Sequence, residues 1–211
     1  MATPSRFSRL FSLTRPSAAR IAAFLAAQEG ASLSYTEAGA TRAAPPPGYT
    51  VDHNRVCLGY GAAAFNDAVA SLRRWCMLSL GWAEVHPPEP AIEPGQVVAV
   101  VARHFGFWSM NACRIVYVVD EACGAGGGRR FGFAYGTLPD HGAVGEERFL
   151  VEWRPGDDSV WYDLYAVSRP GHLLARLGYP LVRGLQRRFA RASKGAMVAA
   201  TRARGGPDAA A

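Results

Sequence analysis

The residues best suited to acid–base chemistry lie in one stretch, 137–147, between two segments rich in aromatic and aliphatic residues. It contains Asp140 and His141 and ends with the acid pair Glu146 and Glu147. A carboxylate that faces an apolar cavity has a raised pKa and can donate or accept a proton. His141, a few residues earlier, is a candidate partner for such a carboxylate. The stretch therefore offers a general acid and a general base, provided that the fold turns both toward one cavity.

Side chains alternate across a strand, and this separates the two acids. Glu147 shares a face with three apolar positions of the following strand, which are Phe149, Val151 and Trp153. Glu146 shares the other face with Arg148, Leu150 and Glu152. One of the two acids should therefore point the same way as the core-facing residues. The structural alternative is a solvated turn in which Asp140 caps the chain and both acids pair with neighbouring arginines.

A second group of polar residues lies in "YTEAGATR", residues 35–42. Gly39 permits a tight turn there. Tyr35 and Thr41 are suited to the polar mouth of a cavity, or they belong to an ordinary loop. Arg169 follows the last predicted strand and either holds a ligand carboxylate or caps a neighbouring segment.

Several motifs with known chemistry are missing from the sequence. There is no H-E-x-x-H metal motif, no G-x-S-x-G nucleophile elbow and no glycine-rich phosphate loop between a strand and a helix. The four cysteines are far apart and lack zinc-ligand spacing, so we expect reduced thiols. The sequence therefore predicts neither a metal nor a cofactor.

The positive charge of the chain is concentrated at its ends. The formal net charge is +6, and the segment from His172 to Pro207 carries eight cations and no acid. No aromatic residues alternate with these cations, so we expect no binding to nucleic acid. The cations fit the solvated face of an amphipathic helix, and peripheral contact with an anionic membrane remains an option.

The periodicity of the chain predicts an α+β fold. Helical spacing covers 16–30, 61–80 and 172–203, whereas strands are expected at 49–58, 97–107, 113–121, 130–138, 146–154 and 159–168. The connections between these strands are too short for crossover helices, so the sheet should be antiparallel. The C-terminal helix carries an apolar seam, which we expect to be formed by Leu174, Leu177, Leu181, Leu185, Phe189, Ala192, Ala196 and Ala200. A curved sheet of six or seven strands wrapped round this helix is the helix-grip architecture.

The strand at 130–138 has one bulky and one bare face. Phe131, Phe133 and Tyr135 alternate with Gly132, Ala134 and Gly136. The small face lets something approach the backbone closely. We expect that neighbour to be either the C-terminal helix or a ligand between the helix and the sheet.

Several of these segments resemble one family of proteins. They are "YTEAGATR" (35–42), "FNDAVASLRRWCMLSLGW" (65–82), "CRIVYVVDE" (113–121), "FGFAYGTLPDHGAVGEERF" (131–149) and "LLARLGYPLVRGLQRRF" (173–189). The resemblance is to the domain-of-unknown-function family nineteen-ninety, also known as UPF zero-five-four-eight proteins, and it runs from about Pro16 to about Arg191. It implies a START-like, Bet v 1-like fold and gives weight to Glu146 and His141 within the matching motif, but it names no substrate.

Two functions remain open at this point. The first is a carrier or sensor that binds a small apolar molecule, with ligand contacts from Tyr35, Thr41, Gly132, Ala134, Tyr135, Gly136, Thr137 and Arg169. The second is a cyclase- or hydrolase-type enzyme that uses Glu146 and His141 in the same cavity.

We expect one domain at 16–204 between a basic disordered tail (1–15) and a second tail (205–211). Reduced cysteines favour the cytoplasm, and the basic, serine-rich start makes an organelle the alternative.

Overall fold

A single antiparallel sheet forms the framework of the protein. The computed structural model describes residues 10–123, 127–171 and 179–204. The strands are β1 (Phe11–Ser12), β2 (Thr50–Tyr60), β3 (Ala83–His86), β4 (Val97–His104), β5 (Phe107–Cys123), β6 (Gly128–Thr137), β7 (Ala143–Arg154) and β8 (Ser159–Pro170). Seven of them follow the order β2-β8-β7-β6-β5-β4-β3, with every neighbouring pair antiparallel, and β1 pairs with β5.

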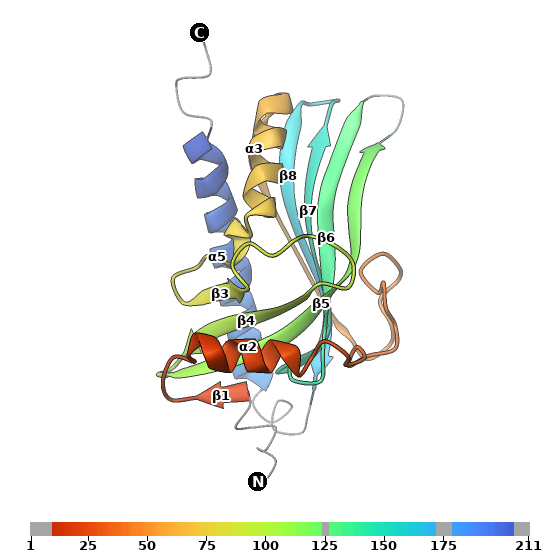
Figure 1. Cartoon of the computed structure of the whole chain (residues 1–211). Helices are drawn as coiled ribbons and strands as arrows, with labels where there is room; N and C mark the ends of the chain where they lie inside the picture. Colours follow the sequence, from red (N-terminus) through yellow and green to blue (C-terminus); the bar gives the residue numbers. More distant parts are fainter. Residues whose placement is uncertain (1–9, 124–126, 172–178, 205–211) are drawn as a thin grey trace, which may run out of the picture.

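The predicted α+β helix-grip class is confirmed by this arrangement. Figure 1 shows the long helix α5 (Tyr179–Arg204) and the shorter α3 (Gly61–Arg73) side by side against the curved sheet. We call the face of the sheet that meets these helices the inner face and the opposite one the outer face. The sequence did not predict β1 or β3, because both are too short to show a clear alternation.

The helix α3 ends earlier than its periodicity predicted. Trp75 adopts a left-handed backbone conformation (φ 56°), which breaks the helix and leads into the 3-10 turn η1 (Cys76–Leu78). The indole of Trp75 is buried, and its Nε1–H donates to the carbonyl of Pro90 at 2.9 Å. The break in the helix therefore directs the Trp75 side chain into the core.

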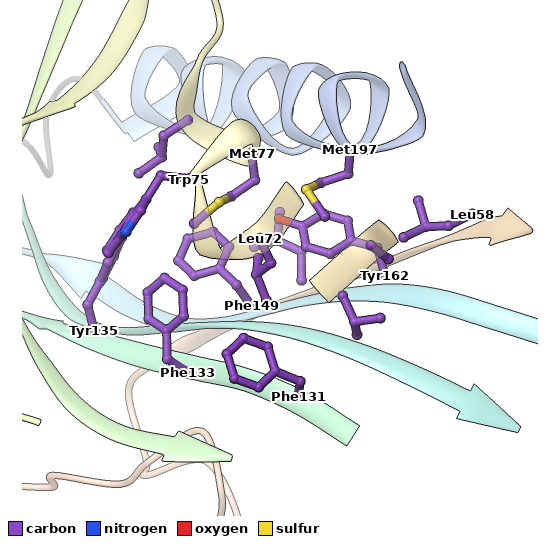
Figure 2. Packing of buried hydrophobic residues seen from close by; sticks show 14 of the residues in the cluster. Leu58, Leu72, Trp75, Met77, Phe131, Phe133, Tyr135, Phe149, Tyr162 and Met197 are labelled. Carbon is purple, nitrogen blue, oxygen red and sulfur yellow. The ribbon is translucent and has the colours of Figure 1, made fainter. Parts of the chain in front are cut away.

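The main core lies between the inner face and the helices. Figure 2 shows Phe133 and Phe149 from the sheet packed near Trp75 and Met77, with Met197 of α5 above Tyr162. The Tyr162 hydroxyl and the Ser193 hydroxyl of α5 are 2.8 Å apart. Aromatic side chains at alternating strand positions therefore belong to the inner core, as the bulky face of β6 indicated.

The predicted seam of α5 was wrong in its rotation. The buried positions are Ala190, Ser193, Met197 and Thr201, whereas Leu181 is 53% exposed. Leu185 and Phe189 are half-buried and line a cavity, and Leu174 and Leu177 lie outside the described residues. The contact face is built from small and polar residues apart from Met197, which lets the helix approach α3 and η1.

Truncation of Leu185 tests this rotation. We expect Leu185→Ala to lower the free energy of unfolding by only about 1 kcal/mol, because the side chain already borders empty space. Urea melts of both proteins measure the difference. A loss above about 2 kcal/mol would show that Leu185 is part of the tightly packed core.

The helix α2 (Ala18–Ala26) covers the outer face at one end of the sheet. Ser17 caps its N-terminus by accepting from the Arg20 N–H, and Ile21 and Phe24 pack against Ala99 and Val101 of β4. A disordered tail was expected at 1–15, but within this range Leu10 is buried and β1 pairs with the sheet. Residues 1–9 and 205–211 lie outside the described residues. Within the described ranges, no helix is long and apolar enough to cross a membrane.

Candidate functional site

A cavity of about 910 Å³ lies between the inner face and the first half of α5. Its wall is mainly apolar and includes Leu78, Val100, Leu164, Ala166, Val182, Leu185 and Phe189. The polar residues at the wall include Asp52, His104, Tyr135, Thr137, His141 and Glu147. A volume of this size fits a drug-sized molecule, and a few polar groups in an apolar wall are typical of ligand sites.

Of the two adjacent acids Glu146 and Glu147, Glu147 has its carboxylate on the inner face, at the wall of this cavity. It lies on β7 directly opposite Tyr135 of β6, and the Tyr135 hydroxyl donates to its Oε2 at 2.8 Å. This is the one hydrogen bond that its carboxylate receives from the part of the chain that the structure describes, so Oε1 is available to a ligand in the cavity that Glu147 lines. The Glu147 side chain is partly exposed, and it lies at the wall of the cavity.

The surroundings of Glu147 raise its pKa to about 7. Burial is the largest cause, because the charged form loses its hydration. The nearby carboxylate of Asp52 adds to the rise in this pKa, and the hydrogen bond from Tyr135 opposes it. Asp52 itself is paired with Arg183 of α5, whose Nη2 lies 2.6 Å from Oδ1. Glu147 therefore exchanges its proton near neutral pH and has no cation beside it among these contacts.

Glu146 faces the opposite side of the sheet. Its Oε2 accepts from the Tyr35 hydroxyl at 2.7 Å and the Gly39 N–H at 2.8 Å, and its Oε1 accepts from the Thr41 N–H at 3.0 Å and the Thr41 hydroxyl. Gly39 has φ 88°, a conformation that suits glycine and aims its N–H at the carboxylate. The structure therefore brings together Tyr35, Thr41 and Glu146 as predicted, but as a buried anchor for the loop 34–42 on the outer face.

Further contacts hold the same loop. The Thr41 hydroxyl lies 2.6 Å from the Tyr117 hydroxyl, and Arg148 Nη1 donates to the Thr41 carbonyl at 3.0 Å. Arg42 stacks on the ring of Tyr117 at 3.7 Å. Glu146 is also among the residues that line the cavity, but its side chain is only 2% exposed, and Tyr35, Gly39 and Thr41 on the outer side hold both oxygens of its carboxylate.

The small face of β6 is also on the outer side. A Cβ on Gly136 would meet the Tyr35 hydroxyl at 2.2 Å, and one on Gly132 would meet the Phe149 carbonyl of β7 at 2.2 Å. Of the described residues that line the cavity, none is Gly132, Ala134 or Gly136. The close neighbours are thus Tyr35 and the backbone of β7, and neither the C-terminal helix nor a ligand-sized space lies there.

The remaining predicted residues lie in different places. His141 and Thr137 line the cavity, with His141 Nδ1 accepting from the Ala143 N–H at 2.9 Å and Thr137 Oγ1 accepting from the Gly145 N–H at 3.0 Å. Arg169 is exposed and stacks on Tyr49 at 4.9 Å, away from this cavity. Because the Glu146 carboxylate is directed to the outer face, the structure does not bring it to His141.

Sequence reasoning missed two polar features of the wall. Asp52 and Arg183 are far apart in sequence, so their pairing carried no local signal. His104 of β4 lines the cavity, and its Nδ1 has no hydrogen-bond partner within the described ranges. Burial, with a smaller contribution from Arg188, lowers the pKa of His104. In the described residues, no group of three or more His, Cys, Asp or Glu side chains is placed to hold a metal.

Several cations of α5 interact with the protein itself. Arg188 stacks on Trp82 at 4.4 Å, and Lys194 donates to Asn54 at 3.3 Å. Arg187 and Arg191 are exposed at the edge of the cavity. The basic segment therefore serves partly to dock the helix.

Comparison with known proteins gives consistent matches along most of the chain. The family model described as "Domain of unknown function (DUF1990)" matches residues 34–196. A UPF0548 protein of Dictyostelium discoideum is 35% identical over 67% of this chain and 68% of its own length. A UPF0548 protein of Deinococcus radiodurans is 36% identical over 86% of this chain and 94% of its own length. Among solved structures, a hypothetical protein from Helicobacter pylori is 14% identical, with a TM-score of 0.49 over 72% of this chain and 88% of that chain.

Proposed function

The chain belongs to the DUF1990 family, and from this premise we propose that its cavity binds a small, mainly apolar molecule. The observation that carries the proposal is the cavity of about 910 Å³ under α5, with Glu147 and Tyr135 as a polar pair in an apolar wall. Apolar surface drives the binding of such a ligand, and one or two polar groups orient it. The protein would then act as a carrier or sensor.

Catalysis is the second candidate function, and the position of Glu147 favours it. A carboxyl with a pKa of about 7 is half ionised at neutral pH and can both take and give a proton. In this version Glu147 replaces Glu146 as the acid–base residue, because the Glu146 carboxylate is directed away from the cavity. His141 lines the same cavity and would be a second polar contact for a substrate.

Native mass spectrometry of the purified protein separates the two candidates. Wild type and Glu147→Gln are compared for bound small molecules. A carrier should retain the same compound in both proteins, at equal or lower occupancy in the variant. An enzyme should retain a different compound in the variant, because unconverted substrate accumulates when proton transfer is removed. A protein that never retains a compound and binds no apolar probe would contradict both functions.

Filling the cavity should block binding of an apolar probe. Ala166 lines the cavity on β8 directly opposite Glu147, so the ring of Ala166→Phe would occupy ligand space. We expect this variant to weaken binding of the neutral dye N-phenyl-1-naphthylamine about tenfold or more, measured by fluorescence titration. Ala199→Phe adds the same ring to the exposed side of α5 and should bind like wild type. Equal binding by all three proteins would place the dye elsewhere.

The cellular setting remains a set of predictions. A cytoplasmic location, the absence of nucleic-acid binding and peripheral contact with an anionic membrane all rest on the sequence. The stacking of Arg188 and the hydrogen bond of Lys194 leave fewer cations of α5 available for a membrane surface.

A further inference from the structure

We infer that the ligand of this cavity carries a basic nitrogen, whose ammonium group pairs with Glu147; the inference rests on the proposed function. It adds a class of ligand, an amphiphilic amine, to the general proposal of an apolar molecule. The charges that the protein itself supplies around the carboxylate favour this class of ligand.

The titratable groups that interact with Glu147 in the described part of the chain come from four strands, and none of them is a cation. They are Asp52 of β2, Cys113 of β5, Tyr135 of β6 and Tyr162 of β8. Arg183 of α5 is the nearest cation identified in these contacts, and it is held by Asp52, with Nη1 also donating to Gln186 at 2.8 Å. Asp52 is therefore paired with Arg183, whereas no counter-ion is found for Glu147 in the described part of the chain.

An ammonium group supplies what this arrangement lacks. A buried carboxylate is costly unless it is paired, and Glu147 lines the cavity with its Oε1 not engaged in a described hydrogen bond. A hydroxyl would donate one hydrogen bond and leave the charge uncompensated. A ligand carboxylate would bring a third negative charge next to Glu147 and Asp52.

Two arginines at the cavity edge would instead favour an anionic ligand, because they are positively charged. Arg187 and Arg191 line the cavity where α5 meets solvent, and both are exposed. Charges in water are screened and contribute little to binding, whereas Glu147 is only partly exposed and burial is the main influence on its carboxylate. The geometry therefore favours a cation at the inner end of the ligand.

Three probes that differ only in their head groups test the inference. They are n-dodecylamine, dodecan-1-ol and dodecanoate, each titrated below its aggregation concentration by calorimetry. At pH 8 we expect wild type to bind the amine about tenfold or more tightly than the alcohol. Glu147→Gln should lose this preference and bind the alcohol within about twofold of wild type. Glu121→Gln removes the same charge from an exposed site and should keep the preference.

The pH dependence provides an independent readout. Amine binding should tighten between pH 6 and pH 8 in wild type, because Glu147 ionises over this range, and should not change in Glu147→Gln. Alcohol binding should vary little in either protein.

The possible failures are distinguishable. Equal affinity for all three probes, or tightest binding of dodecanoate, would overturn the amine inference and leave the cavity as an apolar binding site. Failure of every probe, together with failure of the neutral dye to bind, would overturn the proposed function and the inference with it.

Discussion

Replacement of Glu147 by Gln should raise the free energy of unfolding by about 3 kcal/mol at pH 8. The pKa of Glu147 rises from 4.5 to about 7 on folding, mainly through burial. Between these values the folded protein binds more protons than the unfolded chain, so stability falls as pH rises through this window. Gln keeps an oxygen that accepts from the Tyr135 hydroxyl, but it carries no charge to desolvate.

The test is a series of urea melts of both proteins from pH 5 to pH 8. The stabilisation of the variant relative to wild type should be small at pH 5 and should grow until about pH 7. Glu121→Gln, at an exposed position, should follow the wild-type profile. A constant difference between Glu147→Gln and wild type at every pH would show that Glu147 ionises in the folded state as it does in the unfolded chain.

The stability that the protein loses when Glu147 ionises suggests that this carboxylate has a function. Proteins tolerate a destabilising buried charge most often where the group is used. An apolar residue at position 147 would fill the same space beside Phe149 and Tyr135 without the desolvation penalty. A ligand cation that pairs with Glu147 would also remove the penalty, so the amine should stabilise the protein more at pH 8 than at pH 6.

The sheet was predictable because its signals are local. Strand alternation and short turns between 97 and 168 indicate antiparallel neighbours, and β4 to β8 follow in that order. Alternation also placed Glu147 on the same face as Phe149 and required one of the two acids to point as the core-facing residues do; in the structure Phe149 is in the core and Glu147 lines the cavity. The choice of Glu146 as the catalytic acid came from the motif "YGTLPDH…GEE", and a motif match does not state which way each side chain points.

The remaining features depend on contacts between distant segments. The bare face of β6 was recognised, but no local signal says that Tyr35, about a hundred residues earlier, covers Gly136. The predicted rotation of α5 about its axis was wrong for a related reason. An apolar seam is expected to be buried, but here Leu185 and Phe189 border a cavity, and the packed side uses Ser193 and Thr201. Residues that line a cavity break the rule that the most apolar face is the most buried one.

Glu146→Gln should lower the free energy of unfolding by about 3 kcal/mol or more, the opposite sign to the change at its neighbour. The Glu146 carboxylate accepts four hydrogen bonds from Tyr35, Gly39 and Thr41, and it is buried. An amide at this position turns one acceptor oxygen into a donor group. At least one of the donors of the loop 34–42 is then left facing another donor.

Urea melts and dye binding together separate the two acids. Tyr35→Phe removes one of the four hydrogen bonds and should cost less than Glu146→Gln, about 1 to 2 kcal/mol. Both variants should still bind N-phenyl-1-naphthylamine under folding conditions, because the cluster lies on the outer face of the sheet. Loss of binding in a folded Glu146→Gln protein would mean that the loop anchor also shapes the cavity. Unchanged stability would mean that the carboxylate is not the anchor of the loop. Adjacent acids on one strand thus carry separate tasks, because strand alternation sends one to the loop anchor and the other to the cavity.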